Sequence, residues 1–206
     1  MLNNTSARRV LAVVVEPLAR GLLRMGVSPD AVTLVGTLGA ATGALVFFPR
    51  QQWFVGTIVI VAFIFSDMLD GTMARLSGRQ GPWGAYLDST LDRVGDGAIF
   101  TGLALGFMAA GDTRTAAVAL ACLVGGAVVS YAKARAEGLG ATANVGIAER
   151  AERLLIALFA AGLYGLGIPY LLPAALWVLA VLSWVTVAQR MWHVRGQLRT
   201  TTEPAP

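Results

Sequence analysis

Two pairs of aspartates in an apolar chain are the residues best suited to do chemistry. Asp67 and Asp70 are three residues apart, and Asp88 and Asp92 are four apart, so on helices each pair shares a face. An aspartate at membrane depth costs about 2.5 to 3.5 kcal/mol, so clustered aspartates there mark a functional site. Carboxylates suit hard divalent cations, whereas one His and one Cys are too few for a zinc-type site. The pattern therefore predicts a Mg2+ site, with Mn2+ as an alternative ion.

The segment between the two aspartate pairs predicts how they meet. Residues 76–82 contain a serine, two glycines and a proline, which no continuous helix favours. The two helices must therefore turn back and face one another, which places the aspartates on opposite sides of one site. Gly71 and Gly84 lack side-chain bulk beside the carboxylates, so backbone or a nucleotide can approach. Helix packing is the alternative role of these glycines.

The composition predicts a membrane protein. The 206 residues are 56% hydrophobic and 14% charged, with a mean hydropathy of +0.66, which is too apolar for an ordinary soluble domain. A span needs about 20 mostly apolar residues. We therefore expect an all-α integral membrane protein, in which a single domain covers residues 1–206. Its six predicted transmembrane helices are roughly 31–49, 53–75, 83–110, 114–136, 150–168 and 170–194.

Both ends of the chain carry weaker signals. Residues 7–25 place charged side chains near one helical face, which predicts a juxtamembrane, interfacial amphipathic helix; a polar leader is the alternative. Gly26 can end that helix, and Ser28 and Pro29 provide an N-cap and a first-turn proline for the next one. Residues 198–206 are short, polar and proline-containing, and we expect them to be disordered.

The basic residues predict the orientation in the membrane. With six spans, most of them fall at one membrane face, and only Arg50 and Arg114 fall at the other. This bias places both termini and the aspartate site on the cytoplasmic side of the cell membrane. The sequence pI of about 9.8 does not indicate nucleic acid, because the charges flank spans and no nucleic-acid-binding motif is present. The lipid bilayer and phosphate-bearing substrates are the better partners. The residues at the first face are Arg8, Arg9, Arg20, Arg24, Arg75, Arg79, Arg93, Lys133, Arg135, Arg150, Arg153, Arg190, Arg195 and Arg199.

The aspartates belong to a longer pattern, Asp67-x-x-Asp70-Gly71-x-x-Ala74-Arg75, followed after eight residues by Gly84-x-x-x-Asp88-x-x-x-Asp92. At every fixed position this pattern resembles the signature of the CDP-alcohol phosphotransferase family. The resemblance implies a membrane enzyme that moves a phosphatidyl or related group from a CDP-linked donor to an alcohol and releases CMP. It also implies a homodimer with one active site per protomer.

The resemblance assigns roles to the carboxylates. It implies two metal ions that share Asp67 and Asp88, with Asp70 as a ligand to one ion and Asp92 close to the other. By family analogy, Asp92 is also the general base that accepts the proton of the attacking hydroxyl. Asp96 lies one helical turn further along the same face, and we expect a supporting carboxylate or a helix contact there, with a role as the base as the alternative.

The resemblance also implies a binding site for the donor, CDP-diacylglycerol. Arg75 can pair with a donor phosphate through its planar guanidinium, although it could instead cap the end of its helix. Asp30 and Thr33 lie outside the motif and could simply cap the first span. The other residues that the resemblance places around the cytidine are Ala31, Val32, Gly71, Ala74 and Gly81.

Two further segments bear on the acceptor alcohol. They are Ser130-Tyr131-x-Lys133-Ala134-Arg135-Ala136-Glu137-Gly138 and Ile147-x-Glu149-Arg150-x-Glu152-Arg153. Both look like the actinobacterial phosphatidylinositol phosphate synthase branch of the family, whose acceptor is inositol phosphate. A doubly negative phosphate needs cations, and the candidates are Lys133, Arg153 and Arg190, with Ser130 as a hydroxyl contact.

Other readings of these cations stay open. They could satisfy the positive-inside bias and bind lipid head groups, and Arg195 is a rival to Arg190. We expect Arg135 and Arg150 to pair with neighbouring glutamates or to face water. Glycerol 3-phosphate is the alternative acceptor, which would make the enzyme a phosphatidylglycerophosphate synthase. A divalent-cation transporter is disfavoured, because the aspartates lie near helix ends and Ala74-Arg75 falls between the two pairs.

Overall fold

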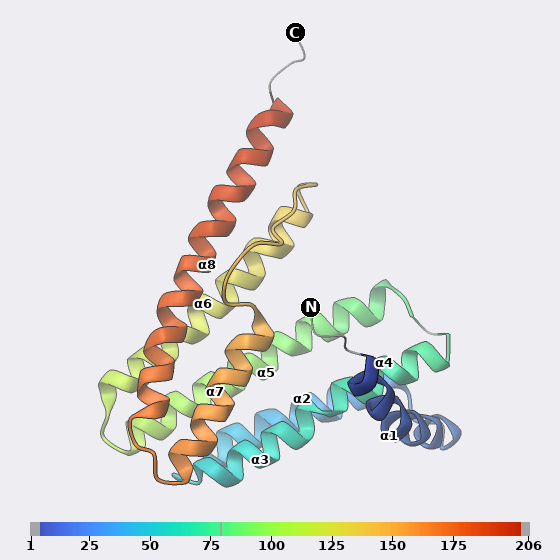
Figure 1. Ribbon diagram of the computed structural model, residues 1–206, viewed down its shortest axis with the longest axis horizontal. Helices are drawn as coiled ribbons and strands as arrows, with labels where there is room; N and C mark the ends of the chain where they lie inside the picture. The colour runs from blue at the N-terminus through green and yellow to red at the C-terminus, as the bar shows by residue number, and fades with distance from the viewer. Residues whose placement is uncertain (1–4, 79, 203–206) are drawn as a thin grey trace. The chain divides into compact units, whose positions relative to one another are not determined.

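The computed structural model describes residues 5–78 and 80–202, without the side chains of residues 5–14, Asp67 and residues 200–202. Within these ranges the chain forms helices and no strand, so the predicted all-α fold is confirmed. Two compact units can be distinguished, Met1–Gly43 with Ile58–Gly95, and Ala44–Thr57 with Asp96–Pro206. The helices are α1 (Thr5–Arg24), α2 (Pro29–Phe47), α3 (Trp53–Ile64), α4 (Ser66–Leu76), α5 (Pro82–Ala109), α6 (Thr113–Glu137), α7 (Arg150–Gly165) and α8 (Leu171–Thr202) (Figure 1).

The predicted spans coincide with helices. Within the described residues, four segments are long and apolar enough to cross a bilayer: Pro29–Phe47, Trp53–Leu76, Thr113–Glu137 and Leu171–Arg199. The chain is therefore a multi-pass membrane protein. The other two predicted spans correspond to α5, whose first half carries the motif aspartates, and to α7, which has only 16 residues. The count of six spans stays a prediction.

In the first unit, glycines bring α2 close to α3 and α4. A Cβ atom at Gly39 would lie 2.3 Å from the Phe63 ring, and one at Gly36 would overlap the Ser66 hydroxyl. Since Gly43 faces Val59, the two segments run antiparallel. The predicted second span is interrupted at Phe65, between α3 and α4, and the Ser66 hydroxyl donates to the Phe63 carbonyl there. Small residues on α2 thus allow the close approach that positions α4.

The boundary between α1 and α2 follows the prediction. Gly26 has a φ of +80°, which ends α1 in the left-handed region. The Ser28 hydroxyl accepts a hydrogen bond of 3.2 Å from the Ala31 amide, so it caps α2 ahead of Pro29. α1 packs against α4 (Figure 1), where Ala19 is fully buried. The side chains of residues 5–14 lie outside the described residues, so the amphipathic, interfacial character of α1 stays a prediction.

In the second unit, α6 and α8 run side by side in the same direction (Figure 1). The Cys122 thiol of α6 donates to the Leu176 carbonyl at 3.2 Å, and further along the same pair Arg190 donates to the Val129 carbonyl at 2.7 Å. α7 packs against α8. Aromatic rings pack together near one end of this unit: Phe48, Trp53, Phe107 and Tyr164.

The C-terminal helix is longer than we expected. α8 continues to Thr202, whereas the sequence suggested disorder from residue 198; residues 203–206 lie outside the described residues. The reason is tertiary, because Val194 and Leu198 pack against a buried cluster that contains Ala136 and Ala143. In addition, the Gln197 side chain accepts from the Thr142 amide at 2.9 Å and donates to the Thr142 carbonyl at 2.7 Å.

Candidate active site

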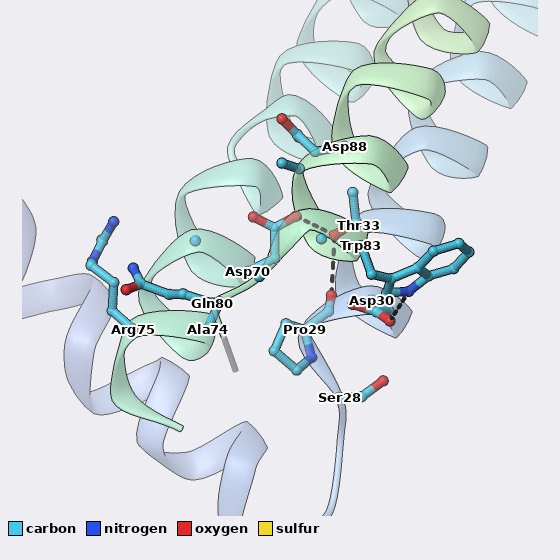
Figure 2. Close-up of a pocket in the computed structure, with 14 residues that line it drawn as sticks. Ser28, Pro29, Asp30, Thr33, Asp70, Ala74, Arg75, Gln80, Trp83 and Asp88 are labelled. Carbon is cyan, nitrogen blue, oxygen red and sulfur yellow. Dashed lines mark hydrogen bonds between the residues drawn. The ribbon is translucent and has the colours of Figure 1, made fainter. Parts of the chain in front are cut away.

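The first unit contains a cavity of about 480 Å³ where the starts of α2 and α5 meet the second half of α4. Figure 2 shows side chains from these segments around one space. α4 ends at Leu76 and α5 begins at Pro82, so the predicted turn between the two motif helices is present. The cavity is lined by Ser28, Pro29, Asp30, Thr33, Asp70, Gly71, Ala74, Arg75, Gln80, Gly81, Trp83, Gly84, Ala85 and Asp88.

Two of the predicted metal ligands, Asp70 and Asp88, line this cavity. The Thr33 hydroxyl of α2 donates a hydrogen bond of 2.6 Å to Asp70 Oδ2, and both side chains are buried (Figure 2). Asp88 is exposed and makes no hydrogen bond or ion pair with the described residues. One carboxylate is thus held in place, and the other faces the cavity from α5.

The donor set in the cavity fits a hard cation. It consists of carboxylate and hydroxyl oxygens, while the single histidine is exposed on α8 and the single cysteine is buried between α6 and α8. Among the described residues, no group of three or more acidic, His or Cys side chains lies close enough to hold an ion. The Asp67 side chain lies outside the described residues, although its backbone belongs to α4. The four-aspartate metal site therefore stays a prediction.

Most of the predicted donor residues line the cavity, but Ala31 and Val32 do not. Val32 is 8% exposed and packs with Ala19 and Met73 in an apolar cluster, and the Ala31 amide donates to the Ser28 cap. The reason is helical periodicity, because Asp30 and Thr33 share one face of α2, whereas the residues between them point elsewhere. Ala31 and Val32 thus lie outside the cavity lining, and their part in donor binding stays a prediction.

Gly71 and Gly84 leave open space, as predicted. A Cβ atom at Gly71 would meet only the tip of the Arg75 side chain at 3.8 Å, and one at Gly84 would meet nothing within 4 Å. Neither glycine is therefore required for helix packing within the described structure. Their small size keeps the cavity accessible beside Asp70 and Asp88.

Sequence reasoning missed Trp83 in this site. Its indole nitrogen donates a hydrogen bond of 3.0 Å to Asp30 Oδ2 (Figure 2). Its ring centroid lies 6.0 Å from that of Tyr86. The position directly after Pro82, in the first turn of α5, was the available signal. Ser28 was expected only as a cap, and Gln80 was not expected to line the cavity.

Arg75 lines the cavity, whereas Asp92 does not. Asp92 lies one turn beyond Asp88 on α5 and is not among the cavity-lining residues that the structure describes. Its carboxylate lies 3.6 Å from the Arg93 guanidinium. Arg75 lines the cavity, is exposed, and donates to the Thr72 hydroxyl at 2.8 Å. The Arg75 guanidinium is therefore accessible to a ligand in the cavity. The role of Asp92 as a base stays a prediction.

In the second unit, Asp96 connects two arginines of α7. Asp96 Oδ1 accepts from Arg150 Nε at 3.0 Å, and Oδ2 lies 3.9 Å from Arg153 Nη2. This contact agrees with the expectation that Asp96 is a supporting carboxylate or a helix contact, and it adds an aspartate partner for Arg150 that was not expected. Arg153 is 1% exposed and donates to the Ala148 carbonyl at 2.9 Å. Its guanidinium lies over Gly126, where a Cβ atom would come within 3.2 Å of Nε.

The remaining candidate acceptor residues of the second unit lie on α6 and α8. Arg190 is 4% exposed and donates to the Val145 and Val129 carbonyls at 2.9 and 2.7 Å. Its Nη2 atom lies 3.9 Å from Glu149. Lys133 is half-buried and makes no hydrogen bond or ion pair with the described residues, and the Ser130 hydroxyl donates to the Gly126 carbonyl of its own helix.

The fold and the cavity together define a multi-pass membrane protein with a carboxylate-lined site between helix ends. The chain belongs to the CDP-alcohol phosphatidyltransferase family, whose model matches residues 26–192. It is therefore a transferase.

Relatives of known name cover most of the chain. It is 55% identical over 202 residues to a phosphatidylinositol phosphate synthase of Streptomyces avermitilis, and this alignment covers 94% of this chain and 83% of the relative. It is 48% identical to one of Cutibacterium acnes, over 89% of this chain and 93% of the relative.

Solved structures of the Mycobacterium tuberculosis phosphatidylinositol phosphate synthase share the fold. The structure with CDP-DAG bound has a TM-score of 0.85 and 44% identity, and the match covers 89% of this chain and 94% of that chain. The structure in complex with manganese and citrate has a TM-score of 0.84 and 44% identity, with 88% of each chain covered.

Proposed function

We propose that this enzyme transfers a phosphatidyl group from CDP-diacylglycerol to a hydroxyl of inositol phosphate and releases CMP. The observation that carries the proposal is the cavity in which the motif residues Asp70, Gly71, Ala74, Arg75 and Asp88 meet. The acceptor is supported by relatives named phosphatidylinositol phosphate synthase, at 55% and 48% identity.

The cavity of the first unit is the proposed donor site. Asp30, Thr33, Gly81 and Trp83 would surround the cytidine, and Arg75 would bind a phosphate through its planar guanidinium. Asp67, Asp70, Asp88 and Asp92 would hold the divalent cations, and the Thr33 hydroxyl keeps Asp70 oriented. Bound Mg2+ or Mn2+ would polarise the donor pyrophosphate and stabilise charge on the departing CMP. A relative solved in complex with manganese supports this assignment.

The reaction requires one proton transfer. The hydroxyl oxygen of the acceptor forms a bond to the lipid-side phosphorus as the bond from that phosphorus to CMP breaks. In our assignment Asp92, which lies on the motif helix one turn beyond Asp88, accepts the hydroxyl proton. This role requires that its carboxylate come within hydrogen-bond reach of the acceptor hydroxyl in the loaded enzyme.

Cations of the second unit are the proposed site for the acceptor phosphate. Lys133, Arg153 and Arg190 would offset its two negative charges, and Ser130 would provide a hydroxyl contact. The two arginines are buried and already oriented by backbone carbonyls. Preorganised guanidinium groups lose little freedom on binding, and their planar forks can bind two oxygens of an anion such as phosphate.

We also propose a membrane arrangement for the enzyme. The chain would form one membrane domain with six spans, with α1 in the interface and with the active site and both termini on the cytoplasmic side. The distribution of arginine and lysine supports this orientation. The enzyme would be a homodimer, as family resemblance implies. Cysteine-accessibility labelling of the two termini and mass measurement of the solubilised enzyme test these points.

The acceptor assay decides the function. Purified enzyme receives CDP-diacylglycerol and Mg2+ with inositol phosphate, inositol or glycerol 3-phosphate in parallel, and CMP and the lipid product are measured. We expect metal-dependent CMP release with inositol phosphate and little with the other two alcohols. An Asp88→Asn variant is the matched negative control. Preference for glycerol 3-phosphate would overturn the acceptor, and metal uptake without CMP release would indicate a transporter.

A further inference from the structure

The segment that joins α6 to α7 is not helical, and three of its alanines, Ala141, Ala143 and Ala148, are buried. Ala143 and Ala148 are 0% and 2% exposed, and Gly146 has a φ of +139°, a conformation that favours glycine. Buried backbone amides and carbonyls outside a helix need other partners, because leaving them unpaired is costly. The question is therefore what satisfies the backbone of residues 145–148.

One hydroxyl of α8 satisfies two of these amides. Thr186 Oγ1 accepts from the Ala148 amide at 3.1 Å and from the Ile147 amide at 3.3 Å, and it donates to the Leu182 carbonyl at 2.8 Å. The residue is 0% exposed. A hydroxyl has one donor hydrogen and two acceptor positions, so all of the hydrogen-bonding capacity of Thr186 is used.

The carbonyls of the same segment hold the two buried arginines. The Val145 carbonyl accepts from Arg190 Nε, and the Ala148 carbonyl accepts from Arg153 Nη1, both at 2.9 Å. The amides of this segment thus bind Thr186, and its carbonyls bind the two guanidinium groups. A shift of the segment would move Arg153 and Arg190 together.

We propose that Thr186 is a positioning residue for the acceptor phosphate: it fixes residues 145–148, and these residues orient Arg153 and Arg190. The inference rests on the proposed function, in which the two arginines bind that phosphate. Gly146 contributes to the same contact, because a Cβ atom there would lie 2.4 Å from Thr186 Cγ2. The fit between α8 and the segment therefore requires both the hydroxyl of Thr186 and the absence of a side chain at residue 146.

The test replaces the hydroxyl while keeping the shape of the side chain. Thr186→Val removes both acceptor positions, and Thr186→Ser restores them. Calorimetric titrations with inositol phosphate and with CDP-diacylglycerol, beside steady-state kinetics, give separate readouts for the two substrates. We expect Thr186→Val to raise the Kd and the KM for inositol phosphate by about tenfold and to leave those for CDP-diacylglycerol unchanged. We expect Thr186→Ser to bind both substrates as the wild type does.

Ser183 provides a matched control on the same helix. It is also 0% exposed, but its hydroxyl has no hydrogen-bond partner in the described structure, so Ser183→Ala should leave both substrates unaffected. Should Thr186→Val not yield folded enzyme, Thr186→Cys, with a weaker acceptor of similar size, replaces it in the same titrations.

The outcomes separate the inference from the function on which it rests. Wild-type enzyme that neither binds nor uses inositol phosphate would overturn the proposed function. Wild-type enzyme that uses it, with Thr186→Val equal to wild type, would overturn the positioning role alone. Equal losses for both substrates, or no rescue by Thr186→Ser, would make Thr186 a general stability residue and would also overturn the inference.

Discussion

Thr33 and Asp70 are 37 residues apart in the chain, and the Thr33 hydroxyl donates a hydrogen bond of 2.6 Å to Asp70 Oδ2. The two side chains are 7% and 8% exposed, so the bond joins α2 to the motif helix α4 at the wall of the cavity. Thr33 Oγ1 also lies 3.1 Å from the Pro29 carbonyl, so the single hydroxyl proton has two acceptors within reach, and the carboxylate of Asp70 is the nearer one. The hydroxyl on α2 therefore holds the Asp70 carboxylate of α4 in one orientation.

Removing this hydroxyl should impair the donor half of the reaction. A hydrogen bond to a charged group is worth about 1.5 to 3 kcal/mol, so Thr33→Val should raise the apparent KM for CDP-diacylglycerol, or the Mg2+ concentration for half-maximal activity, by about tenfold to a hundredfold. Thr33→Ser is the control, because it retains the hydroxyl. A valine variant with wild-type metal and donor dependence would contradict the role of this bond.

The motif aspartates should affect metal binding before anything else. Asp67→Asn and Asp88→Asn each replace an anionic ligand that both ions are proposed to share, so activity should be lost together with metal affinity. Asp88 is exposed and has no partner among the described residues, so Asp88→Asn should keep the wild-type melting temperature. Calorimetric metal titration and thermal melting check both points. Wild-type metal affinity in either variant would refute the ligand assignment.

Asparagine variants of Asp92 and Asp96 should change different kinetic constants. Asp92→Asn removes the proposed base and should lower kcat by about 10² to 10⁴-fold, with donor binding better preserved. Asp96→Asn removes the charged partner of Arg150, which it contacts at 3.0 Å, and should raise the KM for inositol phosphate more than it lowers kcat. An inactive Asp96→Asn beside an active Asp92→Asn would show that the base has been assigned to the wrong carboxylate.

Lys133, Arg153 and Arg190 should share an effect on the acceptor but differ in stability. Each alanine variant should raise the KM for inositol phosphate about tenfold or more, and that for CDP-diacylglycerol less. Arg190→Ala removes the guanidinium donor from one buried carbonyl, that of Val129, and one part-buried carbonyl, that of Val145, so it should also lower the melting temperature, whereas Lys133→Ala should not.

Arg195→Ala is the matched control, because Arg195 is an exposed cation on the same helix as Arg190. If this variant alone raised the KM for inositol phosphate, the rival assignment would be correct.

Asp112 should contribute stability that depends on pH. It caps α6, accepting from the Thr115 amide and hydroxyl at 2.9 and 2.5 Å, and these bonds hold its pKa below the ordinary 3.8. A lowered pKa stabilises the fold above the unfolded-state value, and that stabilisation is lost as pH falls through the folded-state value. Asp112→Ala should cost about 1 kcal/mol at neutral pH. Melting curves should show this difference shrinking below pH 3.8, and a constant difference would contradict the charged cap.

Local patterns in the sequence determined the helices and the chemistry of this protein. Apolar runs of the right length placed the spans, because a bilayer demands about 20 such residues in one helix. Ser28 with Pro29 marked the start of α2, and the turn residues around Gly78 marked the reversal between α4 and α5. The motif from Asp67 to Asp92 indicated the family, which the comparison with known proteins then established. All of these signals act over a few helical turns, so they can be read from neighbouring residues.

Tertiary structure decided which distant side chains meet. Thr33 with Asp70 and Trp83 with Asp30 depend on how α2, α4 and α5 pack. In the second unit, packing on α8 supplied the Thr186 hydroxyl to residues 147 and 148, and it kept residues 198–202 helical where their composition suggested disorder. Periodicity specifies the face of a helix but not the partner that covers it. A partner tens of residues away is selected by the combined packing of several helices, and only the folded chain contains that information.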